Sequence, residues 1–408
     1  MTEGARAPER TSDSTDRVSR RGFLVGAAAL AGVAVGGAVG GAVGGAVGAN
    51  AARVPEDAGG RAVVPFHGER QAGVATAPPA FLTLVALDLA RGVDREALVR
   101  LLRIWTDDAA RLTQGEPGLA DSEPELAAVP ASLAVTVGFG PEVFRVARRP
   151  DRAPGWLGPL PPFGVDALRP EWSDGDLVLQ LCADDQVTLA HAARVLVRQA
   201  STFARVRWVQ QGFRHAPGAV RSGTTMRNLF GQVDGTRNLD PVRDHELIWA
   251  SDGPLAGGTG MVVRRIAMDL DGWEALDRPA REQAVGRRLA DGAPLTGRAE
   301  HDEPDLAATG PDGLTVIPGF AHIRRARTED PHQRFLRRAY NYDDGAGRDA
   351  GLVFVTFQAD VAAQFVPVQR RLDELDLMNT WTTPVGSAVF AVPGGVAPGE
   401  YVGERLLA

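Results

Sequence analysis

Short segments rich in apolar residues and bounded by polar residues or glycine predict the β-strands of the first half of this chain. Four such segments lie at 81–88, 133–137, 176–182 and 205–210. Two longer stretches, near 93–113 and 185–201, place apolar residues at helical spacing, as Leu98, Leu101 and Trp105 show for the first stretch. This spacing predicts amphipathic helices. The resulting order, β-α-β-β-α-β, is typical of a ferredoxin-like unit.

The second half repeats the pattern more loosely. Strand-like segments lie at 261–268, 352–358 and 388–392, helical spacing covers 281–290 and 361–374, and a polar loop covers about 291–312. We therefore expect an α+β fold of two ferredoxin-like halves with antiparallel sheets. The halves are predicted to span 79–225 and 226–408, after a linker and entry segment at 52–78. No residue-level repeat relates them, so this prediction depends on element order alone.

The first fifty residues are typical of an export signal. An arginine pair, Arg20 and Arg21, precedes a long Ala/Gly/Val stretch that ends in the Ala-Asn-Ala of 49–51. This pattern predicts a twin-arginine signal peptide at 1–51 and an extracellular, periplasmic or cell-envelope location. A permanent membrane anchor at 22–49 is the alternative, but its Gly-Gly-Ala-Val repeats are poor in the large apolar residues of a stable span. Export of folded proteins by this route raises the expectation of a redox cofactor.

Composition excludes several chemistries. The 408 residues are 44% hydrophobic, which suffices for a sizeable core. A net charge of -7, with no basic block beyond the N-terminus, makes nucleic acid an unexpected partner. The chain has no lysine, which excludes a Walker A loop and a pyridoxal Schiff base. Its single cysteine, Cys182, excludes c-type haem attachment and cysteine-rich metal sites, and its apolar surroundings favour a buried strand residue over an axial thiolate.

Three residues together predict a haem peroxidase, although each alone also fits a structural role. His322 can bind iron through a neutral imidazole nitrogen. Asp234, between glycines in the 231–236 segment GQVDGT, can carry a proton from one oxygen of peroxide to the other. Arg337 can stabilise the negative charge that develops on the departing oxygen. Because the carboxylate must be ionised and a close arginine favours that form, activity should persist into acid.

Four ordered motifs support this prediction. They are GQVDGT at 231–236, AHIR at 321–324, FLRRAY at 335–340 and GLVFVTFQAD at 351–360. With the entry segments PFHG at 65–68 and QAG at 71–73, the chain resembles the dye-decolourising peroxidase family over most of 62–396, and in particular its exported deferrochelatase/peroxidase members. The resemblance implies haem b between two ferredoxin-like domains, held mainly by the C-terminal one.

The resemblance also assigns roles to individual residues. It implies that His322 is the proximal iron ligand, Asp234 the distal acid–base and Arg337, rather than Arg338, the distal arginine that also contacts haem. Gly235, Thr236 and Arg237 would lie against the haem edge. His67, His301 and His332 are the rival iron ligands. The expected activity is the oxidation of dyes, phenols or other one-electron donors by hydrogen peroxide.

The alternative within the family is a deferrochelatase, which releases iron from haem in an iron-uptake system with membrane partners. A chlorite-dismutase-like haem protein and a non-haem exported binding protein are less favoured, the former because it would not carry the turn around Asp234. The sequence leaves open whether the protein forms a homo-oligomer. The 325–329 segment RARTE departs from the usual Asn-Pro-Arg, so the sequence does not assign the residues that bind the haem propionates.

Two further predictions concern neighbours of the haem. Asp360 is the predicted acceptor for the second ring nitrogen of His322. Tyr340, Tyr342 and Trp249 are candidates for oxidising bulky dyes at the surface, although packing roles are favoured for all three.

Overall fold

The structure, a computed structural model, describes residues 60–408, so the predicted signal peptide at 1–51 lies outside the described residues. The N-terminal half has four strands and two long helices in the predicted order. They are β1 (Phe81–Leu89), α1 (Arg95–Leu112), β2 (Ala134–Phe139), β3 (Leu177–Ala183), α3 (Gln186–Ala200) and β4 (Ala204–Phe213). The strands pair antiparallel in the spatial order β2-β3-β1-β4. The ferredoxin-like prediction for this half is confirmed.

The C-terminal half has the same strand order. Its strands are β5 (Thr259–Met268), β6 (Leu336–Arg337), β7 (Tyr340–Asp343), β8 (Ala350–Gln358) and β9 (Thr382–Val392). They pair antiparallel in the order β7-β8-β5-β9, with β6 beside the far end of β8. If the strands of the second half are counted as β5, β7, β8 and β9, without the short β6, the two halves have the same arrangement. In each half the second strand lies at one edge, followed by the third, the first and the fourth. The sequence did not predict β6 or β7, and β7 is the strand in this second position.

The two sheets join at both edges. Phe139 of β2 pairs with Ala391 of β9, and Phe213 of β4 pairs with Asn341 of β7. Eight strands of the described chain therefore form one closed ring, which leaves few unpaired sheet edges. Buried side chains from strands of both halves fill the interior of this ring, including Leu84, Cys182 and Phe390. The buried position of Cys182 agrees with its apolar sequence surroundings.

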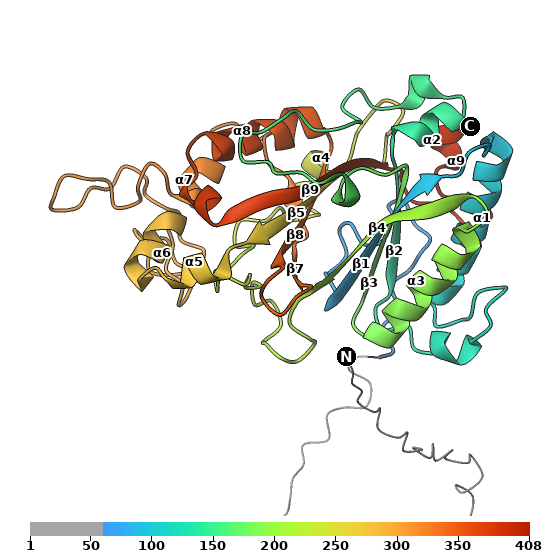
Figure 1. Cartoon of the computed structure of the whole chain (residues 1–408), viewed down its shortest axis with the longest axis horizontal. Helices are drawn as coiled ribbons and strands as arrows, with labels where there is room; N and C mark the ends of the chain where they lie inside the picture. The colour runs from blue at the N-terminus through green and yellow to red at the C-terminus, as the bar shows by residue number, and fades with distance from the viewer. Residues whose placement is uncertain (1–59) are drawn as a thin grey trace, which may run out of the picture. The chain divides into compact units, whose positions relative to one another are not determined.

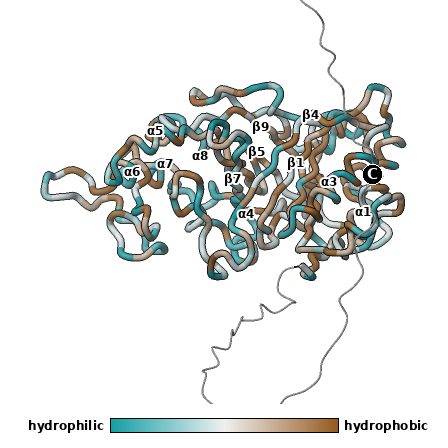
Figure 2. Tube along the Cα trace, turned by 60° about the horizontal axis from the view of Figure 1, so that its bottom comes forward, coloured by the Kyte–Doolittle hydropathy of each residue, from teal (hydrophilic) through white to brown (hydrophobic). Residues whose placement is uncertain are grey.

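Helices α1 and α3 cover the outer face of the first sheet (Figure 1). Leu98, Leu101, Leu102 and Trp105 of α1 are almost fully buried there, and the indole nitrogen of Trp105 donates to the Leu196 carbonyl of α3 at 2.8 Å. The apolar segments of this half gather between helices and strands (Figure 2). Each helix begins at an aspartate cap, Asp94 or Asp185, which satisfies a free backbone N–H.

Shorter helices lie beside the second sheet. They are α5 (Leu270–Glu274), α6 (Arg278–Val285), α7 (His322–Ala326) and α8 (Val366–Leu375), which continues from a π-helical turn at Val361–Phe365. The predicted helix at 281–290 is wrong at its end: α6 stops at Val285 because Gly286 adopts a left-handed conformation with φ 89°. The predicted helix at 361–374 is observed with this irregular first turn.

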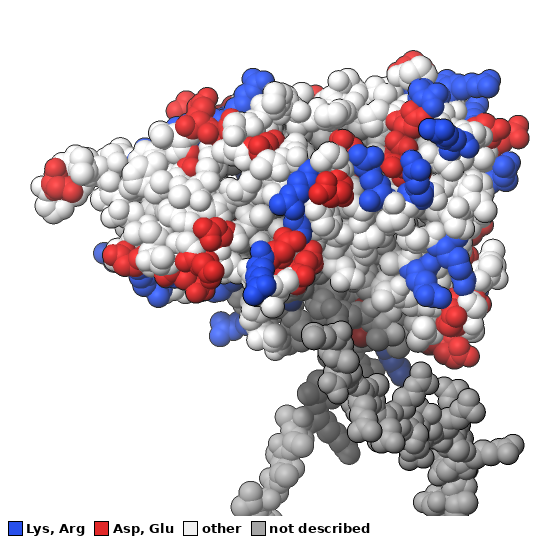
Figure 3. Space-filling model, viewed as in Figure 1, with Lys and Arg blue, Asp and Glu red and all other residues white. Residues whose placement is uncertain are grey.

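The remaining helices are single turns or little more. They are α2 (Pro141–Val146), α4 (His245–Ile248), α9 (Glu404–Leu407) and 3-10 turns at Pro124–Ala127, Pro150–Arg152, Pro170–Trp172 and Leu377–Thr380. No helix between residues 60 and 408 is both long and apolar enough to cross a membrane. Acidic and basic side chains are interspersed on the face seen in Figure 3, so no single-sign surface dominates that view.

Candidate active site

A cavity of about 380 Å³ lies against the outer face of the second sheet. Ile266 and Met268 of β5 and Leu352 and Phe354 of β8 form an apolar wall, and α7 and α8 contribute to another wall. The polar lining includes all the site residues that the sequence predicted. They are Asp234, Gly235, Thr236, Arg237, His322 and Arg337. A largely apolar cavity with a few converging polar groups is typical of a cofactor or substrate site.

Asp234 and Arg337 form an ion pair in this cavity. Arg337 Nη1 donates to Asp234 Oδ1 at 3.1 Å, and the two side chains are 26% and 16% exposed. Asn238, which sequence reasoning missed, fixes the strand that carries the arginine: its side-chain amide binds the backbone C=O and N–H of Arg337 at 2.7 and 2.8 Å. The guanidinium and the carboxylate are therefore held together before any ligand binds.

The turn around Asp234 depends on its glycines. Gly231 has φ 77° and Gly235 has φ 133°, values that favour residues without a Cβ. The backbone N–H of Asp234 donates to the Met226 carbonyl at 2.8 Å, which closes the turn. Beyond it, the Thr236 hydroxyl donates to Glu300 at 2.9 Å. Asp234 is thus presented by a rigid backbone.

The imidazole of His322, the first residue of α7, is oriented by Asp376. Its Nδ1–H donates to Asp376 Oδ2 at 2.6 Å, and Asp376 is only 3% exposed in its side chain. Nε2 is then the ring nitrogen available to a metal. Burial tends to lower the pKa of His322, but the charge and hydrogen bond of Asp376 outweigh it, so the pKa lies above its ordinary value.

The prediction of Asp360 as the partner of His322 is wrong. Asp360 instead caps the turn that precedes α8, where its carboxylate accepts from the Ala363 N–H at 2.8 Å. Asp376 lies 54 residues from His322 in the chain, just after α8, and no sequence motif marks it. Only the packing of α8 beside α7 brings the two side chains together.

Arg338, next to Arg337, lies in a different compartment. It is 2% exposed and donates to the backbone carbonyls of Thr76 and Ala77. Tyr340, Tyr342 and Trp249 are also buried, with 0%, 1% and 6% of their surface exposed. Burial excludes direct contact of these candidates with a dye at the surface, in agreement with the favoured packing roles.

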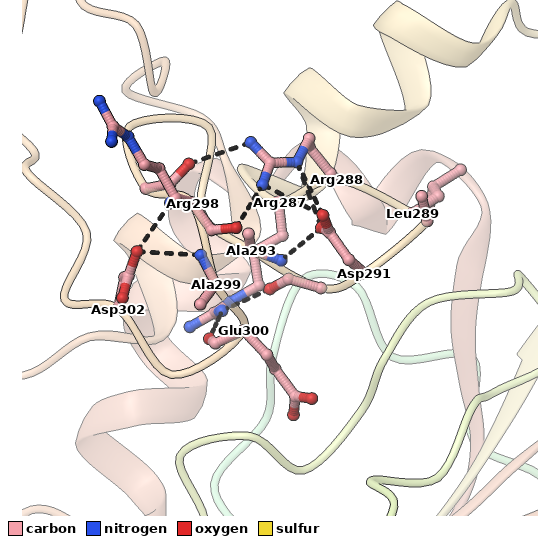
Figure 4. Close-up of polar contacts among 12 residues, drawn as sticks. Arg287, Arg288, Leu289, Asp291, Ala293, Arg298, Ala299, Glu300 and Asp302 are labelled. Atoms are coloured by element: carbon pink, nitrogen blue, oxygen red, sulfur yellow. Dashed lines mark hydrogen bonds and ion pairs between the residues drawn. The ribbon is translucent and has the colours of Figure 1, made fainter.

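A loop with charged residues of both signs borders the cavity on another side. Arg287, which the sequence analysis did not single out, lines the cavity and donates through Nη1 to the carbonyls of Gly292 and Glu300 at 2.6 and 2.8 Å (Figure 4). Burial lowers the pKa of this arginine. His67, His301 and His332 do not line the cavity, so His322 is its only histidine within the described chain.

These residues fit haem. The apolar wall suits a flat porphyrin, His322 offers one oriented nitrogen, and Asp234 with Arg337 supplies a polar pair for a small ligand. Two family models agree with this chemistry: Dyp-type peroxidase, N-terminal, matches residues 71–214, and Dyp-type peroxidase, C-terminal, matches residues 225–397. The chain belongs to the Dyp-type peroxidase family. The predicted family and peroxidase class are thereby confirmed.

Relatives and solved structures agree with this membership. A dye-decolorizing peroxidase of Thermobifida fusca (strain YX) is 39% identical over 430 residues, covering 97% of this chain and 99% of the relative. A deferrochelatase of Yersinia pestis bv. Antiqua (strain Nepal516) is 33% identical over 437 residues, covering 98% and 97%. The crystal structure of a DyP-type peroxidase from Cellulomonas bogoriensis matches with a TM-score of 0.84 at 63% identity, covering 85% of this chain and 99% of that one.

The cofactor prediction agrees with a further structure of the family. An oxyferrous/water mixed complex of DtpA from Streptomyces lividans matches with a TM-score of 0.82 at 44% identity, covering 86% of this chain and 98% of that one. These structures also confirm the predicted α+β fold class. The family models meet between residues 214 and 225, close to the predicted boundary between the halves.

Proposed function

We propose that this chain is a haem-dependent peroxidase in which His322 holds the haem iron while Asp234 and Arg337 act on hydrogen peroxide. The observation that carries this proposal is one cavity lined by an ion pair, Asp234–Arg337, and by a histidine whose second nitrogen is bound to a buried carboxylate. When bound, haem supplies the redox chemistry by which peroxide is reduced and electrons are taken from a donor.

His322 and Asp376 form the ligand-holding part of the site. The 2.6 Å hydrogen bond fixes the imidazole tautomer and the ring orientation, because a carboxylate can only accept from Nδ1–H. The negative charge of Asp376 also increases the basicity of the opposite nitrogen. Asp376 therefore acts as a positioning residue through His322.

Asp234 and Arg337 form the proton-handling part. An ionised Asp234 can accept a proton from one oxygen of hydrogen peroxide and return it to the other oxygen, which then departs as water. Arg337 keeps its own proton and stabilises the negative charge that builds up on the departing oxygen. Two one-electron donors and two protons complete the reduction of one hydrogen peroxide to two waters.

The donors are proposed to be dyes, phenols or other one-electron reductants. The cavity of about 380 Å³ is shared with the cofactor, so a bulky dye would have to deliver its electron from outside. Tyr340, Tyr342 and Trp249 are too buried to touch it directly. Dyes are therefore proposed to make contact at the opening of the cavity.

Replacing Asp234 tests the assignment. We expect Asp234→Asn to retain the haem absorption spectrum but to lose about 10²- to 10⁴-fold in dye turnover, since an amide cannot accept the proton. Asp252→Asn, at an exposed position, serves as the matched control and should turn over normally. Unchanged turnover in Asp234→Asn would reject the carboxylate as the proton carrier.

Deferrochelatase activity is the second candidate, because several relatives at 32–33% identity carry that name. The same haem cavity would serve it, with iron leaving and protoporphyrin remaining intact. Purified holoprotein kept under reducing conditions without peroxide provides the test. Accumulating metal-free protoporphyrin, detected by fluorescence, supports iron release, and an unchanged haem spectrum argues against it.

We further propose export by the twin-arginine pathway and action in the cell envelope or outside it, where membrane iron-uptake partners would be accessible. The support is the Arg20–Arg21 pair before the Ala/Gly/Val stretch. Replacing both with lysine should retain the protein in the cytoplasm, as measured by cell fractionation. A double variant that is still exported would contradict the proposed signal.

A further inference from the structure

Three charged residues form a bridge at the mouth of the cavity. The two carboxylate oxygens of Glu303 bind different arginines: Oε1 contacts Arg327 Nη1, and Oε2 lies 3.4 Å from Arg237 Nη1. Both arginines line the cavity. One carboxylate therefore lies between the guanidinium groups of two residues that line the cavity.

The three residues come from the three segments that build the site. Arg237 follows the turn of Asp234 by three residues, and Arg327 caps the C-terminal end of α7, which begins at His322. Glu303 follows the loop that Arg287 ties together. The bridge thus connects the backbone that presents Asp234 with the helix that presents His322.

The backbone before Glu303 is held in place independently of the bridge. Asp302 accepts from the N–H groups of Arg298 and Ala299 at 2.7 and 2.9 Å, and Arg288 donates to the carbonyls of Gly297 and Arg298 at 3.0 Å (Figure 4). Release of Glu303 from its arginines then requires only a side-chain rotation. The loop itself can stay where it is.

The ion pairs of this bridge are exposed enough for another carboxylate to take the place of Glu303. The side chains of Arg237, Glu303 and Arg327 are 60%, 51% and 43% exposed. Ion pairs this exposed contribute little to stability, because water screens them. Another carboxylate of equal charge can therefore replace Glu303 at small cost, provided that its position is better fixed.

We infer that Arg237 and Arg327 form a docking site for a carboxylate of haem, and that Glu303 is a resident carboxylate that competes with it. Haem b carries two propionate groups, which have the same chemistry as the Glu303 side chain. A propionate attached to a porphyrin in the cavity has its position fixed by the ring, and paired arginines are favoured partners for a carboxylate. This inference rests on haem binding in the cavity, as proposed above.

If Glu303 competes with a propionate, substitutions of the arginines and of the glutamate should change the rate of haem loss in opposite directions. Removing a guanidinium weakens the hold on the propionate, so haem should leave faster from Arg327→Gln and Arg237→Gln. Removing the charge of Glu303 takes away the competitor, so haem should leave more slowly from Glu303→Gln. If the bridge merely tied the three segments together, all three substitutions would open the site and accelerate loss.

Haem transfer from the full-length holoprotein to excess apomyoglobin measures this directly, through the change in visible absorption as haem moves. We expect the rate of loss to rise about fivefold in Arg327→Gln and to fall about two- to fivefold in Glu303→Gln, in line with exposed charge-assisted pairs. Faster or unchanged loss from Glu303→Gln would overturn the inference, as would unchanged loss from Arg327→Gln.

Arg405→Gln is the matched control. Arg405 forms a similar exposed pair with Glu400 at 3.0 Å, and neither residue lines the cavity. Its haem loss should equal that of the wild type, and a change there would show that any lost surface charge alters the rate. Failure of the proposed function would look different, because the wild type itself would then lack a haem band or peroxide-dependent turnover.

Discussion

The two halves of the molecule share one strand order but use the outer faces of their sheets differently. In the N-terminal half, α1 and α3 lie directly on the sheet and bury side chains such as Leu101 and Trp105 almost completely. In the C-terminal half, Ile266, Leu352 and Phe354 face a cavity instead. The catalytic space therefore arises where the second half leaves part of its sheet uncovered by helix packing.

The side chains that form this packed core and the candidate catalytic side chains therefore lie in different parts of the molecule. The outer face of the first sheet is packed by α1 and α3 and holds a large cluster of buried side chains. The candidate catalytic groups lie in turns and short elements of the other half: Asp234 in a glycine turn, His322 at the start of a five-residue helix and Arg337 in a two-residue strand. Substitutions of packed core residues and of the candidate catalytic groups should therefore affect different properties.

The largest expected effect separates two adjacent arginines. Arg337→Leu should lower peroxide-dependent turnover by about 10²- to 10³-fold, because the group that stabilises the departing oxygen is lost. Arg338→Leu should instead lower the free energy of unfolding, because the backbone carbonyls of Thr76 and Ala77 lose their donor. Steady-state kinetics and urea unfolding measure the two effects. Equal loss of turnover in folded samples of both variants would contradict the separation.

A matched pair of leucines tests the two outer faces by stability. Leu101→Ala, in the closed core, should lower the free energy of unfolding by about 2–5 kcal/mol. Leu352→Ala, at the cavity wall, should lower it by about 1–2 kcal/mol in haem-free protein, because its neighbours on one side are already missing. Urea unfolding of both variants gives the comparison. A cost at Leu352 equal to that at Leu101 would mean that the cavity wall is packed like the closed core.

Asp376→Asn sharpens the contrast within the second half. Loss of the carboxylate that orients His322 should weaken haem retention by about 10- to 100-fold. Asp360→Asn is the control, since that carboxylate caps a helix and does not bind the histidine. Haem transfer to apomyoglobin provides the measurement. Equal haem retention in both variants would show that Asp376 does not support haem binding through His322.

The sequence predicts the N-terminal half better than the C-terminal half, and the reason is physical. Strands buried under amphipathic helices leave clear periodicity, as in the 81–88 and 93–113 segments. The four residues of β7, Tyr340–Asp343, alternate aromatic and polar residues, and Asn341 is buried because it bonds the Arg227 carbonyl. An alternation of only four residues is a weak strand signal, so this strand was missed.

The site shows the same limit. Asp234, His322 and Arg337 could be proposed because each lies in a motif, whereas Asp376, Asn238 and Arg287 could not, because their roles depend on long-range contacts. Asp376 meets His322 across 54 residues through the packing of two helices. The closure of the sheets is similar: single residue pairs, such as Phe139 with Ala391, join the halves. A contact of one residue pair leaves no pattern along the chain.

The shared interior of the ring should be the part of the molecule most sensitive to alkali. The chain has three tyrosines and no lysine, so few side chains titrate near pH 10. Burial raises the pKa of Tyr340 and Tyr342 in this interior and of Tyr401 beside the first sheet. Unfolded tyrosines lose their protons near pH 10, so above that pH the folded state binds more protons than the unfolded state.

The free energy of unfolding should therefore be unaffected by these groups below about pH 10 and should fall as pH rises from there toward their raised folded pKa. Each tyrosine contributes up to about 1.4 kcal/mol per pH unit. Tyr340→Phe removes one such group, and because its hydroxyl has no hydrogen-bond partner among the described residues, the substitution should cost little at neutral pH. Urea unfolding between about pH 9 and 11 should then show a shallower decline than in the wild type. An identical decline would mean that Tyr340 ionises at the same pH in the folded and unfolded states, so that burial does not raise its pKa.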